Sequence, residues 1–362
     1  MANSVEQFIL DRSNTYFKNR YERYFLRELK SIEKQLVCPI IRLTDEQKNE
    51  IRSYYRSFGF PYIRTDWHEY IQSISGRYSP KMVPDYFYHN TLERIYNDKK
   101  MIGWGDKATM SLFLPEISFP ETVIVNMNGY YCDPSRNIID LERVYDIIQD
   151  EGVLFAKPTR ASGGGRNASL ITAENADDIL SRLGKNFILQ RIIKQSEELA
   201  SFNASSVNTE KILSFLFHGE VYILASFIRV GAPDSIVDNA SGGKGFTIGI
   251  HDDGSLEPVG FNIRGEKRET DYSGNSLKGR KLSHHKEICD IIRNAHRKLP
   301  YFGFVSWDFC VTANEEPLLI EYNVSNAEVM INQCASGPLF GDMLDDVLKD
   351  ARKHSDSIRY IR

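Results

Sequence analysis

The segment at residues 304–323, FVSWDFCVTANEEPLLIEYN, constrains the fold more than any other part of the chain. Two runs rich in β-branched and aromatic residues flank the polar sequence TANEEP, which is typical of a β-hairpin. A symmetric hairpin centred between Asn314 and Glu315 fixes which side chains face one another. Its facing pairs are Asp308 with Glu321, Ser306 with Asn323, and Cys310 with Leu319. The sequence therefore predicts two carboxylates opposed on one face of a sheet.

A divalent cation would explain this pair of carboxylates. Asp308 and Glu321 carry like charges, so their direct opposition is unfavourable unless a cation lies between them. Asn323, two residues beyond Glu321, points to the same side and can supply a third oxygen. Oxygen ligands of this kind suit Mg²⁺ or Mn²⁺. We therefore predict a metal site, and the alternative is a solvent-facing hairpin with scattered charges.

A second motif joins Lys157, at the end of the buried run VLFAKP, to the sequence ASGGGRN at residues 161–167. Consecutive backbone N–H groups in a glycine loop form a concave anion site, because glycine lets the backbone approach closely. Residues 163–168 formally match a dinucleotide-binding pattern, but that pattern opens a helix and NASLIT is strand-like. The Walker A pattern is absent. We therefore expect a hairpin loop that covers phosphate groups.

The 362 residues are enough for two or three domains. Residues 1–75 are predicted to be mostly helical, because apolar residues recur every three or four positions between Tyr21 and Leu36. Residues 76–150 form a mixed region with a linker, in which ETVIVNMNGYYCD is typical of a hairpin. Strand-like runs separated by glycine-rich turns dominate the remainder. The predicted fold class is α+β.

Charge and cysteine content narrow the class of protein. The net charge of -4 gives no support to nucleic-acid binding. No apolar run approaches the roughly 18 to 20 residues needed to span a bilayer, and the first residues lack signal-peptide features. The five cysteines are scattered without a C-x-x-C pair. We expect reduced thiols and a cytoplasmic location.

The order of these motifs resembles that of the ATP-grasp superfamily over roughly residues 100–345. The sequences VNTEKI, FIRVG and VDNASGG most resemble the sugar-transfer-associated ATP-grasp group, found among polysaccharide-building proteins. The resemblance implies that two α+β subdomains enclose ATP, with a lid subdomain at 151–200 and a C-terminal subdomain with the Mg²⁺ site at 201–362. It also implies ATP-dependent ligation of a carboxylate to an amine through an acyl-phosphate.

The resemblance assigns roles to individual residues. The implied ATP contacts are Lys107, Lys157, Ser162, Gly163, Gly164 and Gly165 for the phosphates, Gln190, Arg191, Ile192 and Ile193 for adenine, and Glu197 or Glu198 for ribose. The implied metal ligands are Asp308, Glu321 and Asn323, and the implied catalytic contacts are Arg229, Asn239 and Lys211. Lys211 departs from the arginine usual in the NT-x-R motif of this group, so that position keeps a point charge without the fork.

The substrates are less constrained than the ATP chemistry. The resemblance suggests capsular or surface polysaccharide biosynthesis, such as joining an amino acid or amine to a uronic acid. Residues 264–286 contain seven Lys or Arg against three acids, so we expect an acidic acceptor. Two alternatives stay open: an ATP-grasp kinase that phosphorylates a sugar hydroxyl, and a nucleotide-binding protein without turnover.

Overall fold

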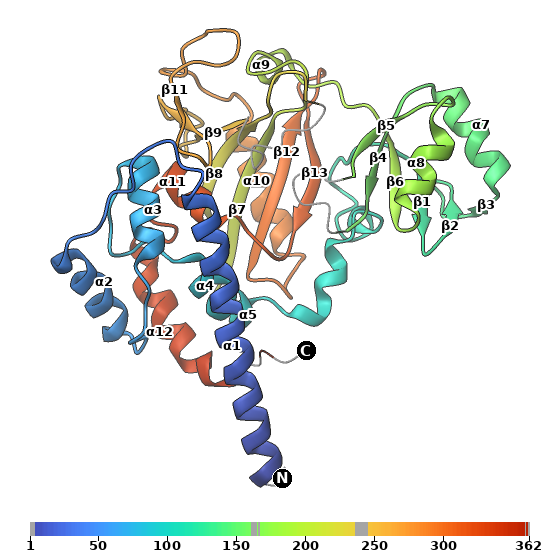
Figure 1. The fold of residues 1–362 in the computed structure, drawn as a ribbon. Coiled ribbons are helices and arrows are strands. Elements are labelled where there is room, and N and C mark those ends of the chain that lie inside the picture. Colours follow the sequence, from blue (N-terminus) through green and yellow to red (C-terminus); the bar gives the residue numbers. More distant parts are fainter. Residues whose placement is uncertain (1–3, 161–164, 166, 236–244, 359, 361–362) are drawn as a thin grey trace.

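The computed structural model describes residues 4–160, 165, 167–235, 245–358 and 360. Two antiparallel sheets and their covering helices make up an α+β fold (Figure 1), which confirms the predicted class. Within this part of the chain, every helix is too short or too polar to cross a membrane.

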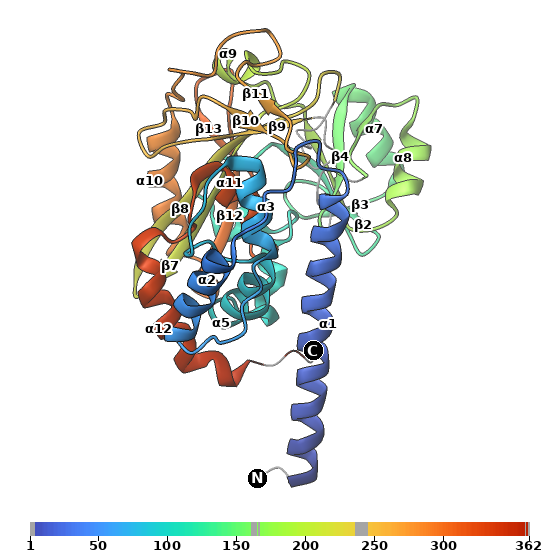
Figure 2. The ribbon, with the colours of Figure 1, turned by 60° about the vertical axis from the view of Figure 1, so that its left-hand side comes forward.

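A helical region comes before the first strand. Its elements are α1 (Ser4–Glu33), α2 (Asp45–Ser57), α3 (Asp66–Ser75), α4 (Asp85–Phe87), the π-helical turn η1 (Tyr88–Leu92), α5 (Glu93–Tyr96), the 3₁₀ segment η2 (Lys99–Gly105) and α6 (Met110–Phe113). Thr44 and Gln47 form the capping box that starts α2, as the sequence predicts. Tyr55 of α2 is buried in the same core as Phe215 of the large sheet. The helical region therefore covers the large sheet, while α1 extends away from it (Figures 1 and 2).

The smaller sheet forms a lobe with two helices, at the right of Figure 1. Its elements are β1 (Thr122–Met127), β2 (Tyr130–Cys132), β3 (Ile138–Ile139), α7 (Leu141–Glu151), β4 (Leu154–Pro158), β5 (Ser169–Ile171), α8 (Ala176–Leu183) and β6 (Phe187–Arg191). Asn128 and Gly129 both take positive φ, which gives the tight β1–β2 hairpin that the Asn-Gly pair predicts. The strand order is β3-β2-β1-β6-β4-β5. The expected boundary at residue 150 therefore runs through this sheet, because β1 pairs with β6.

The larger sheet has the order β11-β10-β9-β8-β7-β12-β13. Its strands are β7 (Thr209–Phe217), β8 (Glu220–Val230), β9 (Phe246–Gly249), β10 (Gly260–Phe261), β11 (Lys267–Arg268), β12 (Phe304–Val311) and β13 (Pro317–Asn323). The accompanying helices are α9 (Glu197–Ala200), α10 (His285–His296), α11 (Val329–Ser336) and α12 (Leu344–His354), with short 3₁₀ turns η5 (Gly341–Met343) and η6 (Ser355–Ser357). Helix α10 packs on one face, and α11, α12 and the N-terminal helices pack on the other.

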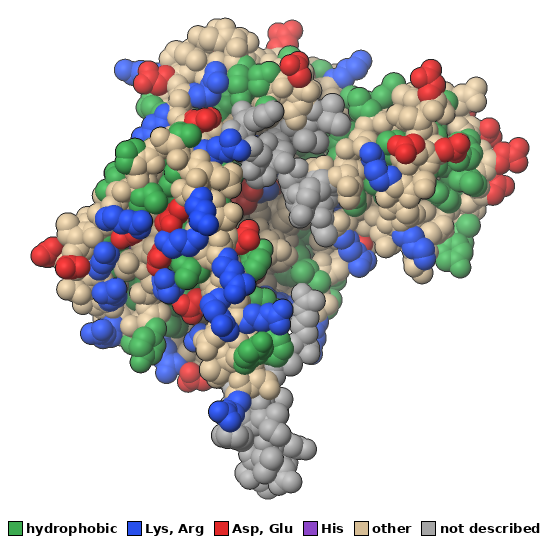
Figure 3. All heavy atoms as spheres, viewed as in Figure 1, with side chains coloured by type: hydrophobic (Ala, Val, Ile, Leu, Met, Phe, Trp, Pro, Cys, Tyr) green, Lys and Arg blue, Asp and Glu red, His purple; other side chains and the backbone are tan. Residues whose placement is uncertain are grey.

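The two sheets approach each other beside β13. The Tyr322 hydroxyl donates to the Trp104 carbonyl of η2 at 2.7 Å, and the Leu319 N–H donates to the Ser118 carbonyl at 2.9 Å. The small-sheet lobe stands apart from the main body in Figure 3, and the surface between them is hollowed. The segment from η2 to β1 therefore joins the β12–β13 hairpin to the smaller sheet, and the predicted site residues meet there.

Candidate active site

The β12–β13 hairpin has the predicted register at its carboxylates. Asp308 faces Glu321, and Ser306 faces Asn323. The predicted pairing of Cys310 with Leu319 is wrong, because Cys310 faces Leu318. The pairing near the turn is centred on residue 314, and a bulge between the two parts of the ladder restores the predicted register.

Each of the opposed carboxylates has its own lysine. Lys211 Nζ lies 2.7 Å and 3.0 Å from the two oxygens of Asp308, and Lys107 Nζ lies 2.6 Å from Glu321 Oε2. Asn323 Nδ2 donates to the other oxygen of Glu321 at 3.2 Å. Lys211 and Lys107 supply positive charge beside the carboxylates, whereas the sequence analysis expected this charge from a metal ion alone. The oxygens of Asp308, Glu321 and Asn323 nevertheless form a donor set that suits Mg²⁺.

The two carboxylates differ in their electrostatic environment. Burial, with the charge of Glu321 adding to it, raises the pKa of Asp308 to about 6, while Lys211 acts in the opposite direction. Burial alone would also raise the pKa of Glu321, but Lys107 and Lys157 hold it far below its usual range. Glu321 is thus the permanently charged member of the pair.

Lys157 is a buried cation near this pair. The residue lies on β4 and is 7% exposed, and its Nζ makes no hydrogen bond or ion pair with any residue that the structure describes. Burial, together with repulsion from Lys107, lowers the pKa of Lys157 to about 8, although Glu321 opposes the shift. An ammonium on a residue buried to this extent is stabilised by a nearby anion. The arrangement is that of an anion site.

Two backbone segments bring Lys107 and Lys157 together. The Lys107 N–H donates to the Thr159 carbonyl at 3.1 Å, and Asp106 pairs with Arg160 directly before the glycine loop. Both lysines act on the charge of Glu321. The structure therefore joins the predicted phosphate lysines to the predicted metal hairpin.

Glu328 is a site residue that the sequence analysis missed. It lies just before α11, and its carboxylate pairs with Arg229 of β8. One of its oxygens lies 4.0 Å from Lys211 Nζ. Burial opposes ionisation, but Arg229 and Lys211 keep the pKa of Glu328 below its usual range. The sequence offered one signal for this residue: it is an acid directly before an apolar helix, and that helix follows the metal hairpin.

The profile of the family described as "Sugar-transfer associated ATP-grasp" matches residues 87–348. The chain belongs to this family. No curated protein matches the sequence.

Solved structures similar to this ATP-grasp chain share little sequence with it. The ATP-grasp ligase PsnB, complexed with minimal precursor, Mg and ADP, is 13% identical, with 71% of this chain and 62% of that chain covered and a TM-score of 0.42. The D-alanyl-alanine synthetase A from Vibrio cholerae is 14% identical, with coverages of 70% and 65% and a TM-score of 0.40. The biotin carboxylase domain of the Hydrogenobacter thermophilus 2-oxoglutarate carboxylase is 14% identical, with coverages of 74% and 49% and a TM-score of 0.43. The chain therefore spans less than two thirds of each of these proteins.

Some predicted ATP contacts of this ATP-grasp chain have other partners. Gln190 Nε2 donates to Thr122 Oγ1 at 2.9 Å, inside the small sheet. Arg191 pairs with two glutamates on the exposed side of that sheet, and Glu198 accepts hydrogen bonds from Ser283. The side chains of Arg191 and Glu198 thus have partners away from Lys107, Lys157 and Lys211, and the adenine and ribose roles of these positions stay predictions.

The remaining predicted ATP contacts are less informative. Ile192 is 45% exposed beyond the end of β6, Ile193 packs against the apolar core beside α10, and Glu197 is exposed at the start of α9. Gly165 has φ of 69°, a value that favours glycine. Ser162, Gly163, Gly164 and Asn239 lie outside the described residues.

Some arginines of the basic segment at residues 264–286, which we expected to face the acceptor, form contacts within the chain. Arg268 stacks over Tyr272 with 4.3 Å to the ring centroid. Arg280 pairs with the buried Asp271 at 2.8 Å and stacks over Phe202. These two arginines hold the loop together, which leaves fewer charges for an acceptor than the sequence suggested.

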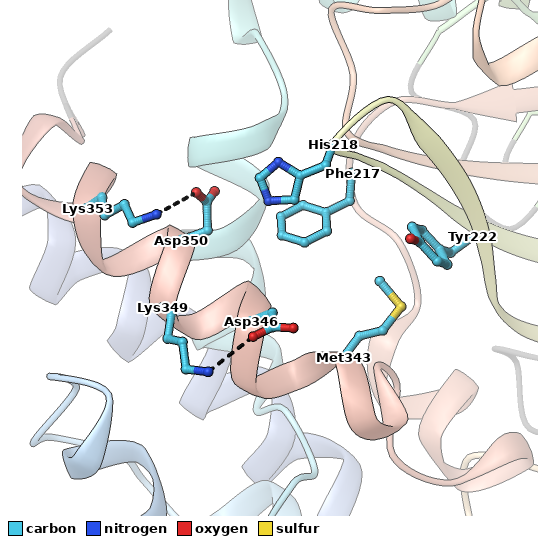
Figure 4. A pocket seen from close by; sticks show the side chains of 8 residues that line it. All are labelled: Phe217, His218, Tyr222, Met343, Asp346, Lys349, Asp350 and Lys353. Atoms are coloured by element: carbon cyan, nitrogen blue, oxygen red, sulfur yellow. Dashed lines mark hydrogen bonds and ion pairs between the residues drawn. The ribbon is translucent and has the colours of Figure 1, made fainter.

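A separate open pocket lies between the β7–β8 turn and α12 (Figure 4). Its volume is about 360 Å³, and it is lined by Phe217, His218, Tyr222, Met343, Asp346, Lys349, Asp350 and Lys353. None of the predicted site residues lines it. The candidate active site is therefore formed by Lys107, Lys157 and Lys211 together with Asp308 and Glu321 of the β12–β13 hairpin.

Proposed function

We propose that this ATP-grasp protein is an ATP-dependent carboxylate–amine ligase that acts through an acyl-phosphate. The observation that carries the proposal is Lys157, a buried ammonium without a partner among the described residues, next to Lys107 and the Asp308–Glu321 pair. A phosphate group would satisfy this charge, and the oxygens of the opposed carboxylates would supply ligands for its metal. The names of the similar structures, which include ligases complexed with Mg and ADP, support the same chemistry.

In this reaction each group of site residues has a separate role. Lys107 and Lys157 bind phosphate oxygens and orient the terminal phosphate toward the carboxylate substrate. Asp308, Glu321 and Asn323 hold Mg²⁺, which when bound neutralises charge on the phosphates. Arg229 stabilises the charge on the transferring phosphate, and Lys211 keeps Asp308 in place beside the metal. We assign Asn239 and the glycine loop of Ser162 to Gly165 to the same site, on sequence alone.

The family name supports a role in making polysaccharides, and we propose an acidic sugar such as a uronic acid as one substrate. The exposed Lys267, Lys278 and Lys286 are cations of the basic segment without an ion pair among the described residues, and they are left to attract it. The amine is then an amino acid or another primary amine. The free cysteines of the described chain fit a reducing compartment such as the cytoplasm.

A coupled ADP assay over a panel of uronic acids and amino acids tests this function. We expect ADP release that requires a carboxylate and an amine together, in the presence of Mg²⁺. ADP release with a sugar alone, accompanied by a stable phosphoester, would instead identify a kinase. ATP binding without ADP release under every combination would identify a nucleotide-binding protein without turnover.

A further inference from the structure

Glu328 is the most accessible of the carboxylates in the site. Its side chain is 36% exposed, compared with 9% for Asp308 and 21% for Glu321. It approaches from α11, an element that belongs to neither the metal hairpin nor the phosphate-binding strands. Glu328 is therefore the carboxylate of the site that is most open to a second substrate.

The N-terminal helical region contacts the loop that carries Glu328. The Asn326 N–H donates to Glu93 Oε1 at 2.8 Å, and Glu93 is only 3% exposed. Asp85, the first residue of α4, contacts the Met330 backbone of α11 and lies close enough to Glu328 for the two charges to repel. Burial first, and this repulsion in addition, raise the pKa of Asp85 to about 7. The hydrogen bond from Asn326 to Glu93 therefore helps to fix the loop that carries Glu328.

Arg229 has two competing anions in the reaction. Its guanidinium is 10% exposed and is paired with Glu328 in this structure. A transferring phosphate carries more negative charge than a carboxylate, so it competes for the same guanidinium. When phosphate takes Arg229, Glu328 is released on the accessible side of the site, and the acyl-phosphate is present at that moment.

We propose that Glu328 selects the amine substrate, and that its carboxylate, once released from Arg229, binds the ammonium group of a primary amine. This inference rests on the proposed ligase function. The ammonium loses one proton to solvent water before attack; the nitrogen then forms the C–N bond as the C–O bond to the phosphate breaks. The phosphate leaves with the bonding electron pair, and the second proton passes from nitrogen to the phosphate or to solvent. Glu328 thus positions the nitrogen and makes the site specific for cationic amines.

The test compares a cationic nucleophile with an uncharged one. Ethanolamine and glycine carry an ammonium at neutral pH, whereas hydroxylamine is uncharged and needs no anionic partner. Each is supplied with Mg·ATP and with the uronic or amino acid that gives the most hydroxamate. Glu328→Gln removes the charge and keeps the shape, and Glu328→Asp keeps the charge. Glu316→Gln is the matched control, because Glu316 is an exposed acid in the turn of the β12–β13 hairpin.

For Glu328→Gln, we expect the kcat/KM for the cationic amine, divided by that for hydroxylamine, to fall at least tenfold. Glu328→Asp should recover part of this ratio, and Glu316→Gln should leave it at the wild-type value. An unchanged ratio in Glu328→Gln overturns the inference, and so does a wild-type enzyme that uses hydroxylamine but neither cationic amine. Absence of hydroxamate with every carboxylate is a different outcome, because it contradicts the ligase function itself.

Discussion

Asp308 and Glu321 lie directly opposite each other on adjacent strands, and each carboxylate is paired with a different lysine. Lys211 reaches Asp308 from the neighbouring strand β7, whereas Lys107 reaches Glu321 from the end of η2. Lys211 and Lys107 therefore already neutralise the two opposed carboxylates. A metal ion that binds here joins a set of cations instead of relieving an unpaired repulsion.

Lys211→Met tests this balance. We expect the free energy of unfolding without Mg²⁺ to fall by about 3 to 5 kcal/mol, because removal of one partner leaves the other charge buried. The double variant Asp308→Asn/Lys211→Met should lose less than Lys211→Met alone, since it removes both charges. Millimolar Mg²⁺ should recover part of the loss in Lys211→Met only. Urea unfolding of the three variants measures these differences, and equal stability of Lys211→Met and wild type would contradict the balance.

Asp308→Asn and Glu321→Gln test the metal site itself. We expect both variants to lose Mg²⁺-dependent ATP turnover by at least a hundredfold while circular dichroism shows a folded chain. The reason is that an amide oxygen carries no charge and binds Mg²⁺ weakly. Full turnover in either variant would show that the opposed carboxylates serve the fold alone.

Lys157→Met tests the phosphate site. We expect its Kd for ATP to rise at least tenfold in titration calorimetry, because phosphate is the missing partner of the buried ammonium. Lys185→Met, at an exposed position on the same lobe, should bind ATP as the wild type does. Unchanged affinity in Lys157→Met would remove this lysine from the site.

The pH dependence of stability gives a second readout for Lys157. Its folded pKa of about 8 lies below the ordinary value of 10.5, so the unfolded chain binds the extra proton between these values. The stability of wild type relative to Lys157→Met should therefore rise from pH 8 to about pH 10. The slope cannot exceed about 1.4 kcal/mol per pH unit. A flat difference across this window would show that the ammonium is solvated.

Helix α10 carries two histidines with opposite titration behaviour. Burial opposes the charge of His285, but Cys289 and Glu210, the latter 2.8 Å away, raise its pKa to about 10. Burial lowers the pKa of His296 to about 4, and its neutral ring bonds to Ser214 and the Phe302 carbonyl.

The two histidines should therefore give opposite slopes of stability against pH. The stabilisation from His285 is complete below pH 6.5 and is lost as pH rises toward 10, because the folded chain there binds the extra proton. For His296 the unfolded chain binds the extra proton, so stability falls as pH drops from 6.5 toward 4. His285→Gln and His296→Gln should each abolish one slope only. Loss of both slopes in one variant would contradict the assignment.

The sequence was sufficient to predict the parts of the site that depend on local pattern. The predicted hairpin placed Asp308 opposite Glu321, and the structure has this pair because a bulge returns the ladder to the predicted register. The position of Lys157 at the end of a buried run was also predicted from local pattern. The bulge between Asp308 and Phe309 was not predicted.

The rest of the site depends on contacts between distant segments. Glu328 meets Arg229 from a position 99 residues away in sequence, and its loop is held by Glu93 of the helical region. The side chains of Glu198 and Arg191, which lie at motif positions, contact Ser283, Glu121 and Glu151. No spacing within one segment encodes such partners, so the role of the N-terminal helices became visible only in the folded chain.

Hydroxylamine trapping is the measurement that tests the central claim most directly. With Mg·ATP and a uronic or amino acid, the wild-type protein should form a hydroxamate, with one ADP released for each hydroxamate. This stoichiometry is expected because hydroxylamine intercepts the acyl-phosphate in place of the amine. ADP release with a phosphorylated sugar as the sole product, or no hydroxamate with any carboxylate, would contradict the account of this site as a carboxylate–amine ligase.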